Sequence, residues 1–436
     1  MKNFVPSFAA LLQELNLIMT LPTFQNFLVI AYGWVFARRR TVTAMIQAAG
    51  AVGVKHHSTF HRFFAAARWS LDELGLTTFG LVQPWLGETT YLALDDTLAR
   101  KSGRRMFGAG MHHDPLISSR KLAVLNWGHS WVIVGVLVKF PFRTDRYFCL
   151  PILFRLYLNK SAADRARRVY RTRPELAVEM LQVLAKAKKT LRFHVVADSL
   201  YGGKSVLREL PANCQLTSRL HLDARLYDAP PARRPGQRGR ARKRGERLSS
   251  PRRMLEDRAH RVTLELYGRR ERVRLSHCVA RSEADLARPL RVVAVESLTT
   301  EGRLQAFYST CPEATAQQVL AWYARRWAIE QTFQETKGYL GFEQPQSWTR
   351  RAVERTAPLA MLLYSLIVLW FADHGHRLWQ APERPWYRSK RGPAFVDMLD
   401  ILRTETLRSN IISLGLQGPG SRKIIQTLQQ VSSLAA

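Results

Sequence analysis

The sequence predicts an α/β protein whose core is interrupted by a β-rich insertion and flanked by helical regions. Two short apolar runs, TYLALDD and LRFHVVAD, end in acidic residues and indicate buried strands. Closely spaced strand-like runs then fill residues 205–312. The stretch before Leu86 shows helical spacing without strand alternation. With 436 residues, the chain is long enough for two or three domains with substantial cores.

We expect the N-terminal region, residues 1–86, to form a helical domain. Its segment RRRTVTAMIQAAGAVGVKHHSTFHRFF indicates short helices joined by a Gly-containing turn. The segment carries a cluster of basic side chains, namely Arg38, Arg39, Arg40, Lys55, His56, His57, His61 and Arg62. A helix-turn-helix-like DNA-binding module and a plain helical domain with a basic surface fit this pattern about equally well.

The expected α/β core comprises residues 87–204 and 313–374. TYLALDDT predicts a buried strand that delivers a carboxylate at its tip. KLAVLNW and SWVIVGVLVKF predict two strands of a meander, and RYFCLPILFRLYL adds another. PELAVEMLQVLAKAKKT predicts an amphipathic helix, and LRFHVVADSLYGG a second buried strand that ends at Asp198. Acids at strand ends are typical of the sites of α/β folds.

The insertion, residues 205–312, is expected to hold strands at CQLTSRL, RVTLELYG, ERVRLSHCVA, PLRVVAVESLT and LQAFYST. Within it, residues 233–253 contain ten Arg or Lys residues and one acid, Glu246. This composition predicts a flexible basic loop that orders on a phosphate backbone. After the core, residues 375–436 are expected to form a helical C-terminal region that takes part in dimerisation or DNA contacts.

The charge balance points to a polyanionic partner. Lys and Arg number 66 against 34 Asp and Glu, which gives a net charge of +32. Much of the excess is clustered Arg, which favours nucleic acid. The four cysteines form no CxxC pair, so we expect reduced thiols and no zinc site. We read no signal peptide, and the apolar run Pro358 to Phe371 is short for a bilayer span, which predicts a cytoplasmic protein without a membrane partner.

The stretch YARRWAIEQTFQETKGYL carries the pattern Y-x2-R-x3-E-x6-K. It has no Pro and one late Gly, so it predicts a helix. At about 100° per residue, Tyr323, Arg326, Glu330 and Lys337 would return to an arc roughly 60° wide. Glu335 would sit about 140° away from Glu330. One face would carry a carboxylate, two cations and a phenol, although a solvated face with an Arg326–Glu330 ion pair is the simpler reading of the pattern alone.

Asp96, Asp198 and Glu330 are the candidate metal ligands. Burying an unpaired carboxylate at a strand end is costly, and metal coordination would offset that cost. Three carboxylates from separate elements suit two Mg²⁺ ions, with Mn²⁺ able to substitute. Helix capping or an ion pair explains each aspartate equally well when it is considered singly. The three acids together, in a strongly basic chain, favour the metal site.

These motifs resemble those of the bacterial insertion-sequence DDE transposases of the cut-and-paste type, whose third motif is the YREK signature. The matching pieces are LDDT, VVADSLYGG and YARRWAIEQTFQETK, and the resemblance extends from the N-terminal helices to about residue 371. It implies an RNase H-like catalytic core with a β-strand insertion before the helix that carries the glutamate. The separations of 198 − 96 = 102 and 330 − 198 = 132 residues leave room for that insertion.

The resemblance also implies residue roles. Asp96, which directly precedes Thr97, Asp198 and Glu330 would be the catalytic metal triad. Tyr323, Arg326 and Lys337 match positions that contact transposon-end phosphates in similar enzymes. ADSLY lacks the acid-basic-Gly form often found at the second motif, which leaves a hairpin intermediate open. The further DNA-binding candidates are the basic side chains of two loops, namely Lys101, Arg104, Arg105, Arg233, Arg234, Arg238, Arg240, Arg242, Lys243 and Arg244.

The leading hypothesis is a transposase that acts as a homodimer on double-stranded DNA. It would nick terminal inverted repeats and join their 3′-OH ends to target DNA. A second hypothesis is a catalytically silent DNA-binding protein derived from such an enzyme. A third is a metal-dependent nuclease that cleaves without joining. Trp322 and Trp327 are placed where they could stack on a displaced base, although core packing is the better expectation for both.

Overall fold

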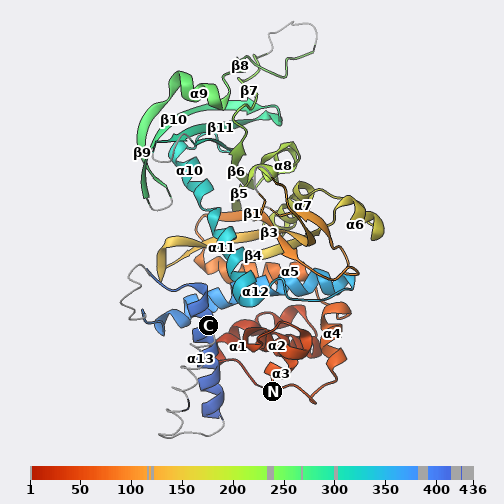
Figure 1. Cartoon of the computed structure of the whole chain (residues 1–436). Helices are drawn as coiled ribbons and strands as arrows, with labels where there is room; N and C mark the ends of the chain where they lie inside the picture. Colours follow the sequence, from red (N-terminus) through yellow and green to blue (C-terminus); the bar gives the residue numbers. More distant parts are fainter. Residues whose placement is uncertain are drawn as a thin grey trace. The chain divides into compact units, whose positions relative to one another are not determined.

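The computed structural model describes residues 2–114, 117–118, 122–232, 240–266, 269–298, 303–381, 391–413 and 424. The chain divides into two compact units. Unit 1 comprises Met1–Trp85, Asp96–Tyr170 and Glu330–Ala436, and unit 2 comprises Leu86–Asp95 and Arg171–Ile329. Two elements labelled in Figure 1, β1 (Thr89–Arg100) and α11 (Trp327–Leu340), contribute residues to both units.

Unit 1 begins with five α-helices and the short 3-10 helices η1 (Asn16–Ile18) and η2 (Gln83–Trp85), as the helical spacing before Leu86 predicts. The α-helices are α1 (Pro6–Gln13), α2 (Leu21–Phe36), α3 (Val42–Ala48), α4 (His57–Ala65) and α5 (Leu71–Val82). The side chains of Thr41 and Ser70 accept hydrogen bonds from backbone N–H groups in the first turns of α3 and α5. These caps satisfy donors that a helix start otherwise leaves unpaired. The residues between α3 and α4 include Gly50 and Gly53 at positive φ, so the expected Gly-containing connection is present.

The strands of unit 1 are the second half of β1, together with β2 (Gly110–His113), β3 (Leu125–Phe140) and β4 (Arg143–Tyr157). β3 neighbours β1 in the sheet order, pairs antiparallel with β2 on its outer side, and forms a long hairpin with β4. The prediction of two strands in KLAVLNW and SWVIVGVLVKF is wrong, because β3 continues unbroken for 16 residues. Gly128, at the expected break, lies within the strand, where it pairs with Gly110 of β2 and where a Cβ would lie 2.3 Å from the carbonyl oxygen of Ala99 in β1.

Helices α5 and α12 (Arg350–Asp373) pack on β4. Gly75 makes close approach of α5 possible, because a Cβ at this position would lie 1.8 Å from the carbonyl oxygen of Ile152. α12 is 24 residues long and apolar enough to cross a membrane by length and composition, but 94% of its apolar window is buried inside the protein. This burial confirms the core helix expected around the run Pro358 to Phe371. Short helices α6 (Lys160–Arg165) and η4 (Gly375–Arg377) and the longer α13 (Phe395–Ser413) complete the unit.

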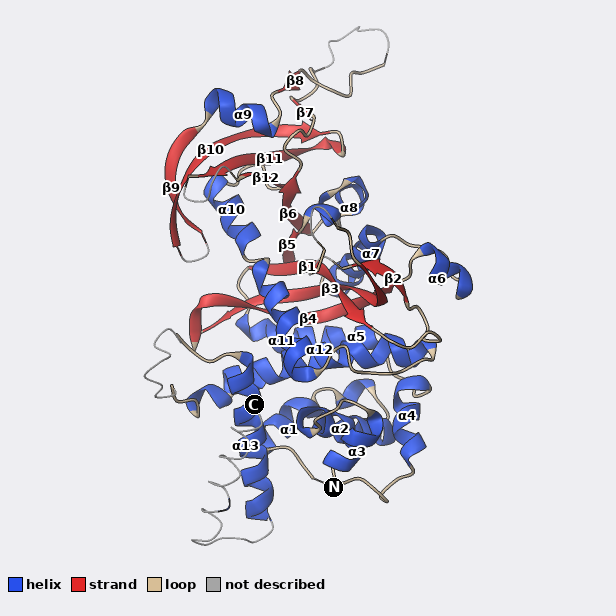
Figure 2. Ribbon diagram, viewed as in Figure 1, coloured by secondary structure: helices blue, strands red, loops and turns tan. Residues whose placement is uncertain are grey.

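Unit 2 is built on a sheet that starts with the first half of β1. This half pairs in parallel with β5 (Arg192–Ala197), and β5 pairs in parallel with β6 (Cys214–Leu220). The order continues β12-β11-β10-β7-β8, and β9 also pairs with β10. The bounds are β7 (Leu226–Tyr227), β8 (Arg247–Leu248), β9 (His260–Leu266), β10 (Arg269–Ser282), β11 (Asp285–Ser297) and β12 (Leu304–Ser309). Figure 2 shows these strands in red.

The helices of unit 2 are α7 (Arg173–Ala187), η3 (Ser199–Gly202), α8 (Lys204–Glu209), α9 (Pro251–Arg258) and α10 (Ala316–Ala324). α7 is the amphipathic helix that the sequence predicts, and Thr172 with Glu175 forms a capping box at its start. The α/β class is therefore confirmed, and a mixed sheet with many helices is compatible with an RNase H-like domain. The run CQLTSRL, expected within the insertion, forms β6 beside β5. Residues 233–239 of the basic loop lie outside the described residues.

Candidate catalytic site and nucleic-acid-binding residues

Asp198 directly follows β5, which confirms the strand end predicted from LRFHVVADSLYGG. Its Oδ1 accepts a hydrogen bond from the backbone N–H of Leu200 at 2.9 Å, so the carboxylate caps η3. Its backbone oxygen accepts from Ser218 Oγ on β6 at 2.6 Å. A Cβ at Gly202 would lie 2.4 Å from the same Ser218 Oγ, so only glycine fits here. These contacts fix Asp198 at the carboxyl ends of two parallel strands.

Asp96 does not lie at a strand end. β1 continues past it to Arg100, because Thr97, Leu98 and Ala99 are buried and remain in the sheet. The expected strand tip is therefore wrong for this residue. Asp95 and Asp96 are consecutive in the strand, so their side chains leave opposite faces of it. The alternation of the strand therefore gives the two carboxylates different surroundings.

Asp95 forms an ion pair with Arg326 in unit 2. Arg326 Nη1 lies 2.6 Å from Asp95 Oδ2, and each side chain is 14% exposed. The neighbouring Arg325 stacks its guanidinium on the ring of Tyr91, 3.9 Å from the ring centroid. Both arginines thus hold the residues between α10 and α11 against the first half of β1. No local pattern predicts the Arg326–Asp95 pair, because the two residues are 231 positions apart in the chain.

The expectation of a single helix over residues 323–340 is wrong. α10 ends at Ala324 and α11 begins at Trp327. The intervening amides make the tighter i→i−3 bonds, from Arg325 N to Trp322 O and from Arg326 N to Tyr323 O. Glu330 and Lys337 share α11, whereas Tyr323 belongs to α10 and Arg326 to the turn. The arc of four side chains computed for a straight helix therefore holds only for Glu330 and Lys337.

Tyr323 is buried in the apolar cluster of unit 2. It is 7% exposed and packs on Phe307, with ring centroids 4.6 Å apart. Burial raises the pKa of its phenol. Trp322 packs against the same cluster and lies 4.2 Å from the ring of His194, so core packing is confirmed for it. Trp327 is 54% exposed, so the expectation of core packing is wrong for this residue.

α11 carries two glutamates, and the structure gives Glu335 a role inside unit 1. Glu335 Oε2 accepts a hydrogen bond from the Tyr364 hydroxyl at 2.8 Å, and Oε1 lies 3.5 Å from Arg146 Nη2. Tyr364 is buried and its pKa is raised by that burial. Glu330, five residues earlier on the same helix, is half-buried. The helix therefore directs Glu335 into the packing of α12 and β4.

Lys337 and Lys101 converge on Glu343 in unit 1. Lys337 Nζ donates to the carbonyl oxygen of Leu98 in β1 at 2.7 Å and lies 3.5 Å from Glu343 Oε1. Lys101 Nζ donates to the carbonyl oxygens of Glu343 at 2.6 Å and Pro345 at 2.9 Å. Burial lowers the pKa of both amines, that of Lys101 to about 8. Both amines are thus bound by groups of the protein itself.

The other predicted phosphate contacts are more accessible. Arg104, Arg105, Arg240, Arg242 and Lys243 are exposed. Arg244 is also exposed, pairs with Glu283 at 3.3 Å and lies over the ring of Tyr227. The remaining three, Arg233, Arg234 and Arg238, lie outside the described residues.

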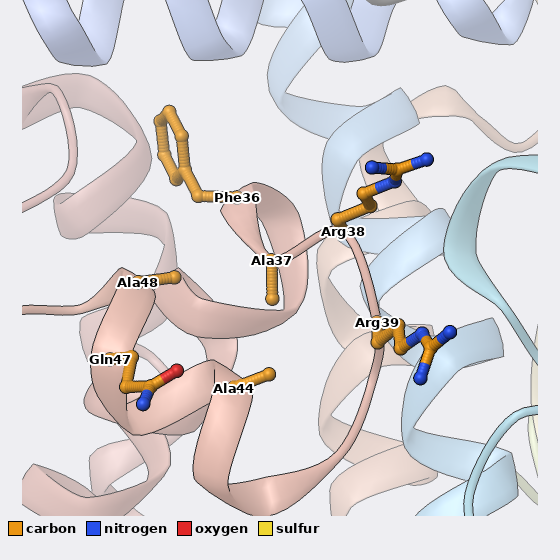
Figure 3. A pocket seen from close by; sticks show the side chains of 7 residues that line it. All are labelled: Phe36, Ala37, Arg38, Arg39, Ala44, Gln47 and Ala48. Carbon is orange, nitrogen blue, oxygen red and sulfur yellow. The ribbon is translucent and has the colours of Figure 1, made fainter.

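The N-terminal basic segment divides into buried and exposed side chains. Arg40 is 8% exposed, and its Nη2 donates to the carbonyl oxygen of Tyr339, so it serves the interior of unit 1. Arg38 and Arg39 are exposed and line a hollow of about 840 Å³ with Phe36, Ala44 and Gln47. Figure 3 shows the two arginines on the segment between α2 and α3. This hollow therefore combines two positively charged side chains with the apolar side chains of Phe36 and Ala44.

Comparison with protein families decides the class. The family described as DDE superfamily endonuclease matches residues 25–280, which is more than half of the chain. The chain belongs to this family. Membership implies a metal-dependent nuclease that takes DNA as its substrate. The matched range includes Asp96 and Asp198 and ends before the segment of Tyr323 to Lys337. No curated protein matches the chain.

DDE nucleases use divalent metals, usually Mg²⁺, and the candidate ligands fit such an ion chemically. Asp96, Asp198 and Glu330 offer only carboxylate oxygens, which hard cations prefer. Asp96 and Glu330 belong to unit 1 and Asp198 to unit 2. Among the described residues, no group of three or more His, Cys, Asp or Glu side chains is gathered closely enough to hold a metal ion.

Proposed function

We propose that this DDE endonuclease is a transposase of the cut-and-paste type. It binds the terminal inverted repeats of an insertion sequence, cleaves DNA there, and joins the resulting 3′-OH ends to target DNA. It acts in the bacterial cytoplasm on the nucleoid, as a homodimer that pairs two DNA ends. The observation that carries the proposal is the combination of the family match over Asp96 and Asp198 with the Y-x2-R-x3-E-x6-K pattern beyond it.

The proposed catalytic residues are Asp96, Asp198 and Glu330, which would hold two Mg²⁺ ions, or Mn²⁺ in their place. When bound, such ions activate the attacking oxygen and stabilise the leaving oxygen in phosphoryl transfer. Cleavage uses water as the nucleophile and joining uses a DNA 3′-OH, so one set of carboxylates serves both steps. The protein's own contribution is to position the scissile phosphate and to offset its charge.

We propose two sets of DNA-contacting side chains, one that binds DNA of any sequence and one that acts at the cut end. The exposed side chains Arg104, Arg105, Arg240, Arg242, Lys243 and Arg244 supply affinity that is independent of sequence and falls with salt, and Arg233, Arg234 and Arg238 extend the same loop. Tyr323, Arg326 and Lys337 are proposed to act at the cut end. Each of these three side chains makes contacts within the protein, so this role requires it to exchange a protein partner for a phosphate.

The decisive assay uses end-labelled duplexes that carry the inverted repeats flanking the gene, with Mg²⁺ or Mn²⁺ and a supercoiled target. We expect cleavage at the repeat ends and joined products. Binding without cleavage would identify a silent DNA-binding protein, and cleavage without joining would identify a nuclease. Asp96→Asn, Asp198→Asn and Glu330→Gln should each lose cleavage by several orders of magnitude while DNA binding persists. Asp223→Asn, at a surface carboxylate that is 57% exposed, is the matched control and should cleave normally.

A further inference from the structure

Trp348 is an exposed aromatic side chain on an anchored backbone. It lies in unit 1 between α11 and α12 and is 69% exposed, more than Trp327 at 54%. Leaving a large aromatic surface in water forgoes the stabilisation that burial would provide. An exposed tryptophan of this kind is a common anchor of binding surfaces.

The backbone around Trp348 is fastened to the loop that follows β1. The carbonyl oxygen of Trp348 accepts a hydrogen bond from Phe107 N at 3.0 Å. Phe107 O in turn lies 2.8 Å from His129 Nε2, and burial lowers the pKa of His129 to about 4, so the ring is neutral and donates from Nε2. The Lys101 amine ties the same loop to the Glu343 and Pro345 carbonyls. The aromatic ring is therefore presented by a backbone that is already ordered.

Exposed arginines lie close in sequence to Trp348 and to Phe107, its hydrogen-bond partner in the loop that follows β1. Arg104 and Arg105 precede Phe107 by two and three positions, and both are exposed. Arg350 and Arg351 follow Trp348 by two and three positions and are also exposed. The nearest acid along α12, Glu354, pairs with Arg350 at 3.0 Å. The exposed charges on these two hydrogen-bonded segments are thus mostly positive, which suits a polyanion better than an apolar protein surface.

We propose that Trp348 is a stacking platform for an unpaired DNA base, and that Arg104 and Arg105 contact the phosphates beside that base. An aromatic ring flanked by arginines is the combination that binds single-stranded nucleic acid. The inference rests on the proposed function, because the two loops directly follow β1, which carries Asp96, and α11, which carries Glu330. The expected ligand of Trp348 is therefore a DNA base near the cut end that has lost its Watson–Crick partner.

Three probes of equal length test the proposal on the full-length protein: an oligothymidylate, the same backbone with abasic residues, and a blunt duplex. Fluorescence anisotropy gives the dissociation constant of each at several salt concentrations. The wild type should bind the oligothymidylate about tenfold more tightly than the abasic strand. Trp348→Leu should remove that difference and leave abasic binding and the salt slope unchanged. Trp348→Phe should keep most of it, because a phenyl ring still stacks.

Arg104→Ala with Arg105→Ala should behave differently, weakening all three probes and lowering the salt slope by about two. Equal binding of Trp348→Leu and wild type to oligothymidylate would overturn the proposal. A loss of dimer in sedimentation of Trp348→Leu, with DNA binding intact, would assign the surface to a second copy and also overturn it. The cleavage assay on repeat-end DNA tests the proposed function separately. A protein that does not cleave DNA can still be tested for base stacking on Trp348, so failure of one proposal is distinguishable from failure of the other. Unchanged thermal unfolding of Trp348→Leu would exclude misfolding.

Discussion

Arg326 Nη1 lies 2.6 Å from Asp95 Oδ2, and the pair is largely shielded from solvent. Arg326 occupies the turn between α10 and α11, and Asp95 precedes the proposed metal ligand Asp96 in β1. The pair therefore holds the turn that leads into the helix of Glu330 against the strand of Asp96. An arginine that the sequence suggests for phosphate contact thus has a carboxylate partner within the protein.

Breaking this pair should cost more stability than breaking a surface pair. Removing one partner of a buried ion pair takes away the opposite charge that faces the other partner, so Arg326→Met or Asp95→Asn should each lower the free energy of unfolding by about 3 kcal/mol. The double variant should lose less than the sum of the two. Urea unfolding of the wild type, the two single variants and the double variant gives the coupling free energy of the pair. Arg350 and Glu354, which are 47% and 36% exposed, provide the control pair, with a coupling of about 0.5 kcal/mol or less. Equal couplings in the two cycles would contradict this expectation.

Substitutions of the two acids of β1 should have different effects on the rate of DNA cleavage. Asp96→Asn removes a proposed metal ligand and should abolish cleavage, whereas Asp95→Asn loosens Arg326 and should leave measurable cleavage in the folded fraction. The measurement is the cleavage rate per folded molecule, with the folded fraction taken from circular dichroism at the assay temperature. Loss of cleavage in Asp95→Asn with retention in Asp96→Asn would move the proposed ligand to Asp95.

Glu335→Gln should reduce stability and spare catalysis, the reverse of Glu330→Gln. The amide can still accept from the Tyr364 hydroxyl, but it loses the charge that faces Arg146, so we expect a loss of about 1–2 kcal/mol. Thermal unfolding and the cleavage rate, measured on both variants, give the comparison. A fully stable Glu335→Gln that no longer cleaves would reverse the assignment of the two glutamates.

Lys337→Met separates a positioning role from a phosphate contact. Its amine donates to Leu98 O in β1, so the variant should be less stable and should cleave more slowly because α11 loses that tie to the strand. If the amine stays on Leu98 O when DNA binds, the salt slope of binding should match that of the wild type. A slope reduced by about one would instead show that Lys337 moves to a phosphate. Arg240→Ala, at an exposed position, is the control for a slope change of that size.

Acid should destabilise the protein through two buried histidines. Burial lowers the pKa of His129 to about 4 and that of His194 to about 3, from 6.5. Between those values and pH 6.5 the unfolded chain binds protons that the folded chain does not, so stability falls as the pH falls through this window. His194→Gln, which can keep a hydrogen bond to Thr217, should shift acid unfolding to lower pH. His221→Gln, at an exposed histidine, should leave the acid unfolding curve in place.

Local patterns in the sequence predicted much of the secondary structure because they depend on neighbouring residues. The strand ending at Asp198, the amphipathic helix α7 and the strands β9 to β12 all follow from alternation, apolar runs and capping residues. The failures also have local causes. No turn residue marks the break at Arg325 and Arg326, and nothing in LDDTLAR shows that buried residues after Asp96 extend the strand.

By itself, the sequence determined the α/β class, the basic charge that suits DNA, and the spacing of Asp96, Asp198 and Glu330, because composition and periodicity are local properties. Only the tertiary structure decided which charged side chains face inward. Arg326 meets Asp95, Glu335 meets Tyr364, and Lys337 meets the carbonyl oxygen of Leu98. Each contact joins residues far apart in the chain, and a charged side chain leaves water only where such a partner compensates it.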